Sequence, residues 1–316
     1  MPLATSTLAP GAAASIATGG VVPEGADAVV AVEHATATDG RVRADERLEA
    51  GDGIRRRGAD ITAGAVVVDA GVRLTPVAMS ALAAAGLGAV AAVRRPRAVV
   101  LTTGDELVEP GAPLRRGQVH DSNSLLLLET LASFGCAVEH GGRVPDTREE
   151  TERLFAAALE ADLVVSSGGV SVGPRDHVKP SLAALGVDEL FWRVAIQPGK
   201  PVWAGRAPGG AIVLGLPGNP LSALVGLHLL VGPLVRTLLG VAEPDAVELP
   251  LAEPVRRLGR RTRALPARLV GGGILPLADA SHQIARAAAA DGLVLIEAGD
   301  GEHAAGAPAP FVALGR

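Results

Sequence analysis

The stretch AVVLTTGDE at residues 98–106 decides the fold, because a short aliphatic run ends there in a polar loop that contains glycine. The same pattern recurs downstream, as DLVVSSGG at 162–169, VAIQPGKP at 194–201 and AIVLGLPGNP at 211–220. Short apolar runs separated by stretches of helical length are typical of a parallel sheet covered by helices. The sequence therefore predicts an α/β domain of the doubly wound type, which we place at residues 96–241.

The elements of this domain follow from the same pattern. Strands are expected at 98–101, 136–138, 162–166, 191–196 and 211–214, and helices at 124–134, 149–160, from 180 onward and 220–239. Asn219 can cap the last helix, and Pro220 suits its first position. The apolar run 221–235 inside it is shorter than the roughly 20 residues that a membrane span requires, so a buried helix is predicted.

The flanking regions have a different texture. Residues 1–95 carry β-like runs at 28–32 and 65–68 and a predicted helix at 76–85, which indicates a linker and a β-rich lobe. From 242 to 316, apolar stretches at 247–249, 274–277, 293–296 and 311–314 alternate with turn residues. This pattern predicts a small β-rich C-terminal domain.

Composition restricts the possible functions. Aromatic residues make up only 2% of the 316 residues and Tyr is absent, so an aromatic platform for stacking bases is disfavoured. The 29 basic and 34 acidic residues give a net charge of −5, which provides no overall attraction to nucleic acid or to an anionic membrane. The single cysteine, Cys136, excludes a disulfide framework and is consistent with a reducing, cytoplasmic compartment.

Two of the loops resemble cradles for an anion. In an open parallel sheet, ligands bind beyond the carboxyl ends of the strands. The loop at 166–173 contains three glycines, whose backbone N–H groups can approach a ligand closely, and the loop at 217–220 leads into a helix N-terminus. For either loop alone, the alternative is that glycine and serine merely form the turn. Two such loops in one sheet favour binding of a phosphate or another oxyanion.

Acidic side chains also follow the predicted strands. Asp105 and Glu106 end the first one, and carboxylates beside a phosphate cradle are typical of a Mg²⁺ site. Asp146, Asp162 and Asp176 lie near later strands, where capping or exposure to solvent is the alternative. The tripeptide Arg55–Arg57 is either a solvated cluster or a wall of an anion site supplied by another domain or subunit.

Taken in order, the motifs TGDEL (103–107), DSN (121–123), SGGVSVG (167–173), PGKP (198–201) and LPGNPLS (216–222) resemble the molybdopterin molybdenumtransferase family. This family includes the bacterial MoeA proteins and the E domain of gephyrin. Stretches at 18–30 and 54–61 resemble it in the same order, so that the similarity covers nearly the whole chain.

The resemblance implies a MoaB/MogA-like central domain, an N-terminal β-rich lobe with a linker, and a C-terminal β-barrel. It implies molybdenum cofactor biosynthesis in the cytoplasm, in which molybdate is inserted into adenylylated molybdopterin with Mg²⁺ and AMP is released. It also implies a homodimer, with the active site between the α/β domain of one subunit and the lobe of the other. Other proteins of cofactor biosynthesis are possible partners, and neither nucleic acid nor a membrane is expected.

The residues and the resemblance together give a set of expected site residues. The expected catalytic residues are Asp105, Glu106, Asp146, Asp176 and Lys200, with Asp105 as the metal ligand. The expected residues for binding the pterin, its phosphate, the nucleotide and the oxyanion are Thr103, Gly104, Asp121, Ser167, Gly168, Gly169, Ser171, Gly173, Pro201, Pro217, Gly218, Asn219, Ser222 and Arg268.

The sequence also departs from the family pattern. The family's Lys-Pro-Gly-Lys reads Gln197-Pro198-Gly199-Lys200, the paired acids read Asp146-Thr147, and a hydroxyl position reads Arg286. Residues 1–17 do not match the family's Asp-Gly-Tyr-Ala stretch. The alternatives are therefore a working molybdenum insertase, a diverged or truncated relative that binds pterin or nucleotide without efficient catalysis, and another enzyme on the same domain, such as a CinA-like nucleotide hydrolase.

Overall fold

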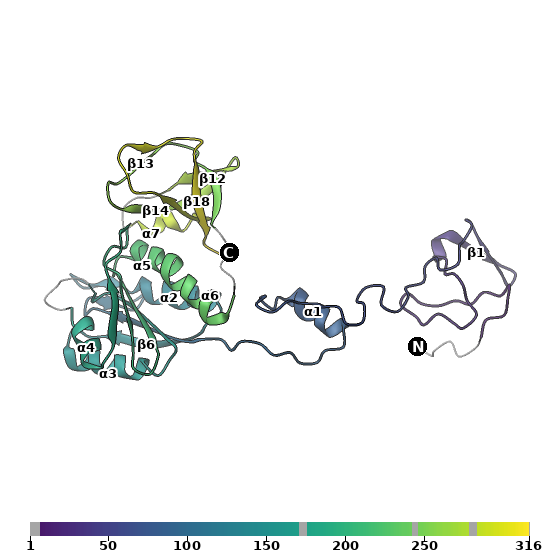
Figure 1. Ribbon diagram of the computed structural model, residues 1–316, viewed down its shortest axis with the longest axis horizontal. Helices are drawn as coiled ribbons and strands as arrows, with labels where there is room; N and C mark the ends of the chain where they lie inside the picture. Colours follow the sequence, from purple (N-terminus) through teal and green to yellow (C-terminus); the bar gives the residue numbers. More distant parts are fainter. Residues whose placement is uncertain (1–6, 171–175, 242–245, 278–282, 316) are drawn as a thin grey trace. The chain divides into compact units, whose positions relative to one another are not determined.

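The computed structural model describes residues 7–170, 176–241, 246–277 and 283–315. The chain forms two compact units (Figure 1). The first comprises residues 1–70 and 74–89, and the second comprises 71–73 and 90–316.

The first unit contains a β-hairpin and a helix. A 3₁₀ turn at Val32–His34 precedes β1 (Ala35–Thr38), which pairs antiparallel with β2 (Arg41–Ala44). The two-residue turn between them is Asp39-Gly40, and both residues have positive φ, as this class of hairpin turn requires. The predicted runs at 28–32 and 65–68 are not strands, and the Asp-Gly turn places the hairpin at 35–44 instead.

The helix expected at 76–85 is confirmed as α1 (Pro76–Ala84). The Thr75 hydroxyl accepts a hydrogen bond from the Ala78 N–H at 3.2 Å, and Pro76 occupies the first helical position.

The second unit is built on a six-stranded sheet in the order β6-β3-β7-β11-β10-β8. The first four strands are parallel, while β10 runs antiparallel to both of its neighbours. The strands are β3 (Arg97–Thr103), β6 (Ala137–Val144), β7 (Leu163–Ser167), β8 (Asp188–Trp192), β10 (Trp203–Arg206) and β11 (Ile212–Leu216). Since β8 points the same way as the parallel strands, its carboxyl end reaches the same edge of the sheet.

Helices cover both faces of this sheet, as the doubly wound prediction requires (Figure 1). One apolar cluster joins the sheet to α2 (Ser122–Ser133), α5 (Pro220–Gly226), a π-helical segment (Leu227–Val231) and α6 (Gly232–Leu239). The other face packs against α3 (Arg148–Ala158) and α4 (Val178–Ala184) through the fully buried Phe155 and Leu182. Cys136 lies in the first cluster, and burial raises its pKa to about 11.

Two elements differ from the sequence prediction. The strand expected at 191–196 is shorter and earlier, because Arg193 has a positive φ of 73° that ends β8 at Trp192. The antiparallel strand β10 is not predicted at all. It is only four residues long and includes Gly205, so it lacks an apolar run.

The C-terminal region forms a second, curled sheet in the order β12-β18-β16-β14-β15. Its strands are β12 (Val247–Pro250), β14 (Thr262–Val270), β15 (Gly273–Pro276), β16 (Gly292–Ile296) and β18 (Pro308–Ala313), and a separate pair is formed by β13 (Val255–Arg256) and β17 (Glu302–His303). A bridge between Leu251 and Ile274 brings the first strand's end to the last strand, which closes the sheet into the expected barrel.

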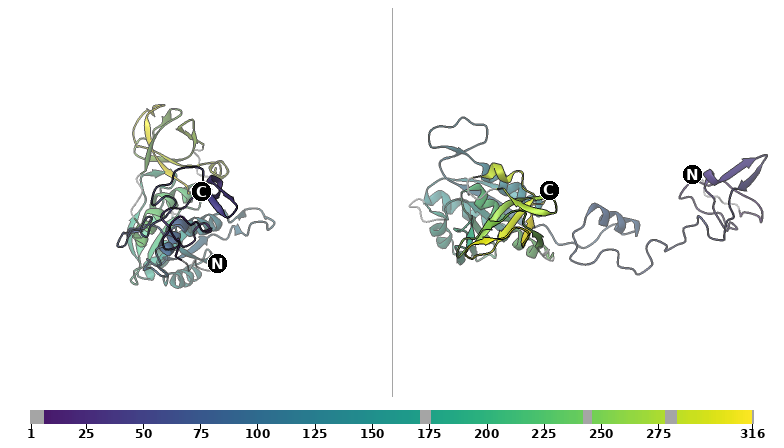
Figure 2. Two further views of the ribbon diagram at one scale, coloured as in Figure 1. Left: turned by 90° about the vertical axis from the view of Figure 1, so that its right-hand side faces the viewer. Right: turned by 90° about the horizontal axis from the view of Figure 1, so that it is seen from above.

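The barrel packs against the face of the α/β domain that carries α5 (Figures 1 and 2). The short strand β9 (Ile196–Gln197) leaves the α/β domain and adds parallel to β14. Leu221 and Leu224 on α5 pack against Ala287 on α7 (Ile284–Ala287), and Val225 packs against Ala264 and Leu293. The barrel therefore holds helix α5 in place on the sheet.

The helical stretch Pro220–Leu239 is the one in the described part of the chain that is long and apolar enough to cross a membrane. More than half of its most apolar window, 56%, is buried inside the structure. Its apolar side chains are therefore accounted for by the core of the α/β domain, as the sequence predicts.

Candidate functional site

The carboxyl ends of β3, β7 and β11 border one cavity of about 750 Å³. Each of the three strands continues into a loop that lines it, at residues 103–104, 167–169 and 217–219. A volume of this size is within the range of small-molecule and cofactor sites. The position at the carboxyl edge of a parallel sheet is the one that the strand pattern predicts.

Most of the predicted site residues line this cavity, and they come from six separate loops. Those in the lining are Thr103, Gly104, Glu106, Asp121, Asp146, Ser167, Gly168, Gly169, Asp176, Pro201, Pro217, Gly218 and Asn219. Asp105, Lys200, Ser222 and Arg268 are described but lie outside the lining. Ser171 and Gly173 are outside the described residues.

The loop after β7 needs its two glycines for packing. Gly168 and Gly169 have φ values of 92° and 66°, which side-chain-bearing residues rarely adopt. A Cβ atom at Gly169 would lie 2.5 Å from Cγ2 of Val178, and one at Gly168 would overlap the side chain of Thr103. These glycines are therefore required by the chain itself, whatever ligand binds.

The loop after β11 differs in this respect. Gly218 has no positive φ, and a Cβ atom there would lie 3.8 Å from the nearest heavy atom, the Cα of Gly168. Asn219 occupies the N-cap position of α5 and Pro220 the first helical position. The capping hydrogen bond expected from the Asn219 side chain is not found within the described residues. Gly218 thus leaves space at the cavity wall that the protein does not fill.

A buried hydrogen-bond network joins the loops. Nδ2 of Asn123 donates to the Ser167 hydroxyl at 2.7 Å and to the Gly218 carbonyl at 2.8 Å. The Ser167 hydroxyl then donates to the Pro217 carbonyl at 3.3 Å. The hydroxyl that the sequence suggests as a donor to an anion is therefore committed to holding the two loops together.

Asp121 also has a structural role. Its Oδ1 accepts from the Ser124 N–H at 3.0 Å and so caps α2, while its Oδ2 accepts from the Thr102 hydroxyl at 2.7 Å. Thr102 is fully buried. Sequence reasoning quotes Asn123 within a motif but assigns it no role, and it misses Thr102, because both act through contacts with residues distant in sequence.

The acidic loop forms a further wall of the cavity. Its base is a parallel pair, β4 (Leu107–Val108) with β5 (Val119–His120). Oδ1 of the exposed Asp105 accepts a hydrogen bond from the Asp146 N–H at 3.2 Å, which ties the loops after β3 and β6 together. Asp146 lines the cavity, so Asp105 contacts a residue of the lining without being part of the lining itself.

The charge of the lining is one-sided. Within the described residues, the lining contains the carboxylates of Glu106, Asp121, Asp146 and Asp176 but no Lys or Arg. An anionic ligand would therefore need backbone N–H groups, the start of α5 or a bound cation. No group of three His, Cys, Asp or Glu side chains in the described ranges could hold a metal ion by itself. Mg²⁺ fits such a set, because it commonly takes one or two carboxylates and completes its shell with water and substrate phosphate.

The remaining predicted residues lie on other surfaces. Lys200 is exposed on the loop between β9 and β10, whereas its neighbour Pro201 lines the cavity. Ser222 is buried on α5, and Arg268 is exposed on β14. The backbone directions of these elements, rather than the residue types, place the three side chains outside the lining.

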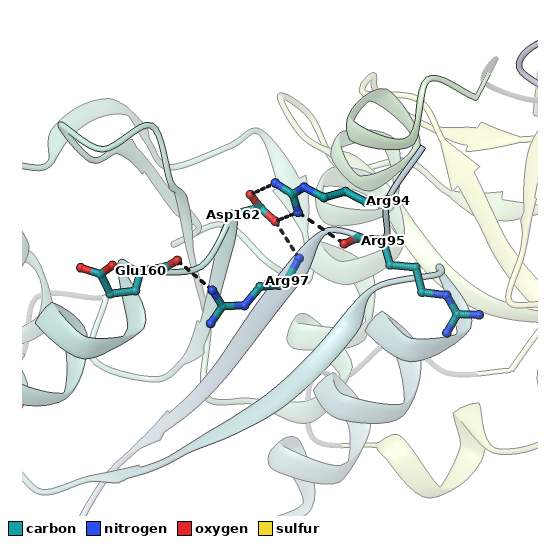
Figure 3. A network of polar contacts seen from close by, with 5 residues as sticks. All are labelled: Arg94, Arg95, Arg97, Glu160 and Asp162. Atoms are coloured by element: carbon teal, nitrogen blue, oxygen red, sulfur yellow. Dashed lines mark hydrogen bonds and ion pairs between the residues drawn. The ribbon is translucent and has the colours of Figure 1, made fainter. Parts of the chain in front are cut away.

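Asp162 lies at the other end of the sheet, where β7 begins (Figure 3). Its carboxylate accepts two hydrogen bonds from Arg94, at 2.6 and 2.7 Å, and a third from the Arg97 N–H at 2.7 Å. The Arg94 guanidinium lowers the pKa of Asp162 to about 2. Asp162 therefore joins residues 94–97 to the start of β7 and lies outside the cavity lining.

Three family models match most of the chain. Residues 3–86 match the MoeA N-terminal region (domains I and II), residues 99–237 a probable molybdopterin binding domain, and residues 248–314 the MoeA C-terminal region (domain IV). The family models therefore follow the order predicted from the sequence motifs.

Individual relatives agree. A molybdopterin molybdenumtransferase of Haemophilus influenzae is 44% identical over 230 residues, which are 72% of this chain and 56% of the relative. Molybdopterin molybdenumtransferase 2 of Mycobacterium tuberculosis is 36% identical, with 95% of this chain and 76% of the relative covered. The crystal structure of a MoeA molybdopterin biosynthesis protein from Pyrococcus horikoshii superposes with a TM-score of 0.77 at 31% identity, covering 98% of this chain and 77% of that one. The chain belongs to the molybdopterin molybdenumtransferase family.

Proposed function

We propose that the protein inserts molybdenum from molybdate into molybdopterin, that it acts on the adenylylated form, and that AMP is released with Mg²⁺. The observation that carries this proposal is the single cavity bordered by the two glycine-containing loops of neighbouring parallel strands. The names of the relatives supply the substrate class, and the cavity supplies a binding site of suitable size.

In this proposal the loops have different tasks. The segment 217–219 presents the start of α5 to a phosphate group, where the helix dipole and unpaired N–H groups favour negative charge. The segment 167–169 forms the adjoining wall and is proposed to position the pterin. Ser171 and Gly173, which lie outside the described residues, stay expected binding residues, and Ser222 would support the start of the helix from within α5.

The carboxylates carry the metal part of the proposal. Asp105 is proposed as the Mg²⁺ ligand; it contacts Asp146, which lines the cavity together with Glu106 and Asp176. Magnesium would neutralise the phosphate charge that the acidic lining cannot. Without such a cation, four carboxylates would repel an anionic substrate.

Positive charge for molybdate must come from outside the lining. Lys200 and Arg268 are proposed as contributors, and the exposed Arg55–Arg57 cluster is proposed as a wall that a second subunit supplies. This makes a homodimer part of the proposed function. Sedimentation equilibrium tests it, since a monomer at every concentration would remove the shared site.

The alternative is a relative that binds pterin or nucleotide without efficient catalysis. The specific observation in its favour is the absence of Lys and Arg from the described lining, together with Gln197 in place of the family's lysine. Both candidates predict binding, and only the first predicts turnover.

The test is release of AMP from adenylylated molybdopterin in the presence of molybdate and Mg²⁺. Asp105→Asn should lower the rate by about 100-fold, because it removes the ligand charge while the amide oxygen can still accept the Asp146 N–H. Glu160→Gln, an exposed acid near the opposite end of the sheet, is the matched control and should leave the rate unchanged. If wild-type protein binds the substrate but releases no AMP, the non-catalytic alternative holds.

A further inference from the structure

Asn123 is a buried side chain whose role neither the sequence motifs nor the relatives assign. It occupies the first turn of α2, is only 7% exposed and lines the cavity. A polar side chain this deeply buried needs hydrogen-bond partners to be tolerated.

Donor and acceptor chemistry decides which atom of the Asn123 amide faces each partner. The Gly218 carbonyl can only accept, so the atom facing it at 2.8 Å must be the amide nitrogen. The second N–H of the same amide goes to the Ser167 hydroxyl at 2.7 Å. Both donors are therefore used on residues that lie 44 and 95 positions away in the sequence.

These two bonds join the loops that form the proposed ligand site. Ser167 ends β7, and Gly218 follows β11, its parallel neighbour. The Ser167 hydroxyl adds a bond to the Pro217 carbonyl, so the network crosses from one loop to the other twice. The first turn of α2 is itself fixed to β3, because Asp121 binds Thr102.

The side-chain oxygen of Asn123 differs from the nitrogen in its hydrogen bonding. Its Oδ1 is buried and has no hydrogen-bond partner among the described residues. The hydrogen bonds that Asn123 does make are both directed at the two loops, so its side chain holds them relative to each other.

We propose that Asn123 is a positioning residue, which sets the spacing of the 167–169 and 217–219 loops and thereby the affinity of the cavity for its ligand. The proposal rests on the proposed function only for the identity of that ligand. It makes no claim that Asn123 touches the substrate.

The experiment compares two substitutions with a control on the same helix. Asn123→Asp keeps the size of the side chain but presents a carboxylate oxygen to the Gly218 carbonyl, so that attraction becomes repulsion. Asn123→Ala removes the side chain and keeps the proposal testable if the aspartate variant does not fold. Leu131→Ala, a fully buried core residue of α2 away from the cavity, lowers stability without touching the loops.

Two measurements are made at a temperature where all variants are folded. Hydrogen–deuterium exchange of the ligand-free proteins should be at least tenfold faster in peptides covering 165–170 and 214–220 for the Asn123 variants only. Calorimetry with adenylylated molybdopterin should show affinity at least tenfold weaker for the same variants, and within twofold of wild type for Leu131→Ala.

The outcomes separate the two levels of inference. Unchanged exchange in both loops of the Asn123 variants overturns the positioning role, and so does an equal loss of affinity in Leu131→Ala. If wild-type protein does not bind adenylylated molybdopterin, the proposed function fails, while the exchange measurement still decides whether Asn123 sets the loop spacing.

Discussion

The two ends of the central sheet use polar residues in opposite ways. At the amino end, Asp162 satisfies its carboxylate with Arg94 and the Arg97 backbone, and the charges cancel within the group (Figure 3). At the carboxyl end, carboxylates border a cavity of about 750 Å³ whose described lining includes two histidines but no Lys or Arg. Both ends are rich in charge, but an arginine pairs with the carboxylate at the amino end, whereas acidic residues outnumber basic ones in the described lining of the cavity.

This difference separates structural from functional polarity. A paired charge at a sheet end stabilises the fold modestly and has no capacity left for a ligand. An excess of acidic residues beside glycine loops is what the proposed site for a cation and a phosphate requires. The predictions below test this separation.

The largest expected effect concerns His228, which belongs to neither end of the sheet. Its protonation lowers the stability of the whole protein in acid, and this loss has to be separated from effects of pH on the two ends. Burial lowers the pKa of His228 to about 4, with the nearby Arg236 acting in the same direction. The unfolded chain takes up this proton near pH 6.5, so the folded state loses stability as the pH falls from about 6.5 to 4. His228→Leu should remove about 2 kcal/mol of that loss.

Chemical denaturation at pH 7, 5.5 and 4 measures the effect. His228 packs edge-on against Phe134, with 5.3 Å between the ring centroids. Loss of this contact in His228→Leu should lower stability little at pH 7, where the histidine is neutral. Parallel stability curves for the two proteins between pH 6.5 and 4 would mean that His228 is protonated in the folded state.

The second prediction tests the cavity end directly. Gly218→Ala should fold normally, because its Cβ has ordinary clearance of 3.8 Å, yet it should weaken binding of adenylylated molybdopterin by about tenfold or more. The matched variant Gly168→Ala should instead lose about 2 kcal/mol of stability, because its φ of 92° and the Thr103 side chain exclude a Cβ. Equal affinities for wild type and Gly218→Ala would show that no ligand approaches this backbone.

The contrast between these glycines also shows what sequence can and cannot predict. The strands ending at Thr103, Ser167 and Leu216 are readable because each is an apolar run followed by Gly or Pro. The sequence identifies Gly168 and Gly218 equally well as loop glycines. Only the packed neighbours, Thr103 against one and open space against the other, distinguish a glycine kept for the fold from one available to a ligand.

Long-range contacts explain the other limits of prediction. Asn123 is the second residue of an ordinary helix, and nothing local indicates its bond to Gly218, 95 residues away. Lys200 lies on the short loop between β9 and β10, but which residue of that loop lines the cavity depends on where the two strands run, and in the structure it is Pro201. Chemistry and order along the chain are predictable, whereas orientation requires the fold.

The third prediction tests the amino end. Asp162→Asn should lower stability at pH 7 by about 1 kcal/mol, because the Arg94 side chain of the pair is 70% exposed and solvent screens it. The depressed pKa of Asp162, about 2, means that this contribution is present above about pH 4 and is lost as the pH falls toward 2. The difference between wild type and variant should therefore disappear near pH 2, and the rate of AMP release at pH 7 should not change. A loss of turnover would show that the amino end of the sheet also contributes to catalysis.

The smallest expected effect concerns the departure from the family at position 197. A lysine there would restore a positive charge, and on charge alone it should raise the apparent affinity for molybdate. Gln197, however, lies on β9 opposite Arg263 of β14, outside the cavity lining, and its Oε1 is buried with no hydrogen-bond partner among the described residues. A new ammonium would lie beside an existing guanidinium at a distance from the carboxylates, so we expect Gln197→Lys to raise the apparent affinity by no more than about threefold.

Gln197→Glu should lower the apparent affinity for molybdate by a similar factor, and the pair of variants separates charge from shape in a molybdate titration of AMP release. A gain of tenfold or more in the lysine variant would place the oxyanion next to β9, and the boundary of the functional end of the sheet would then have to include the strand that joins it to the barrel.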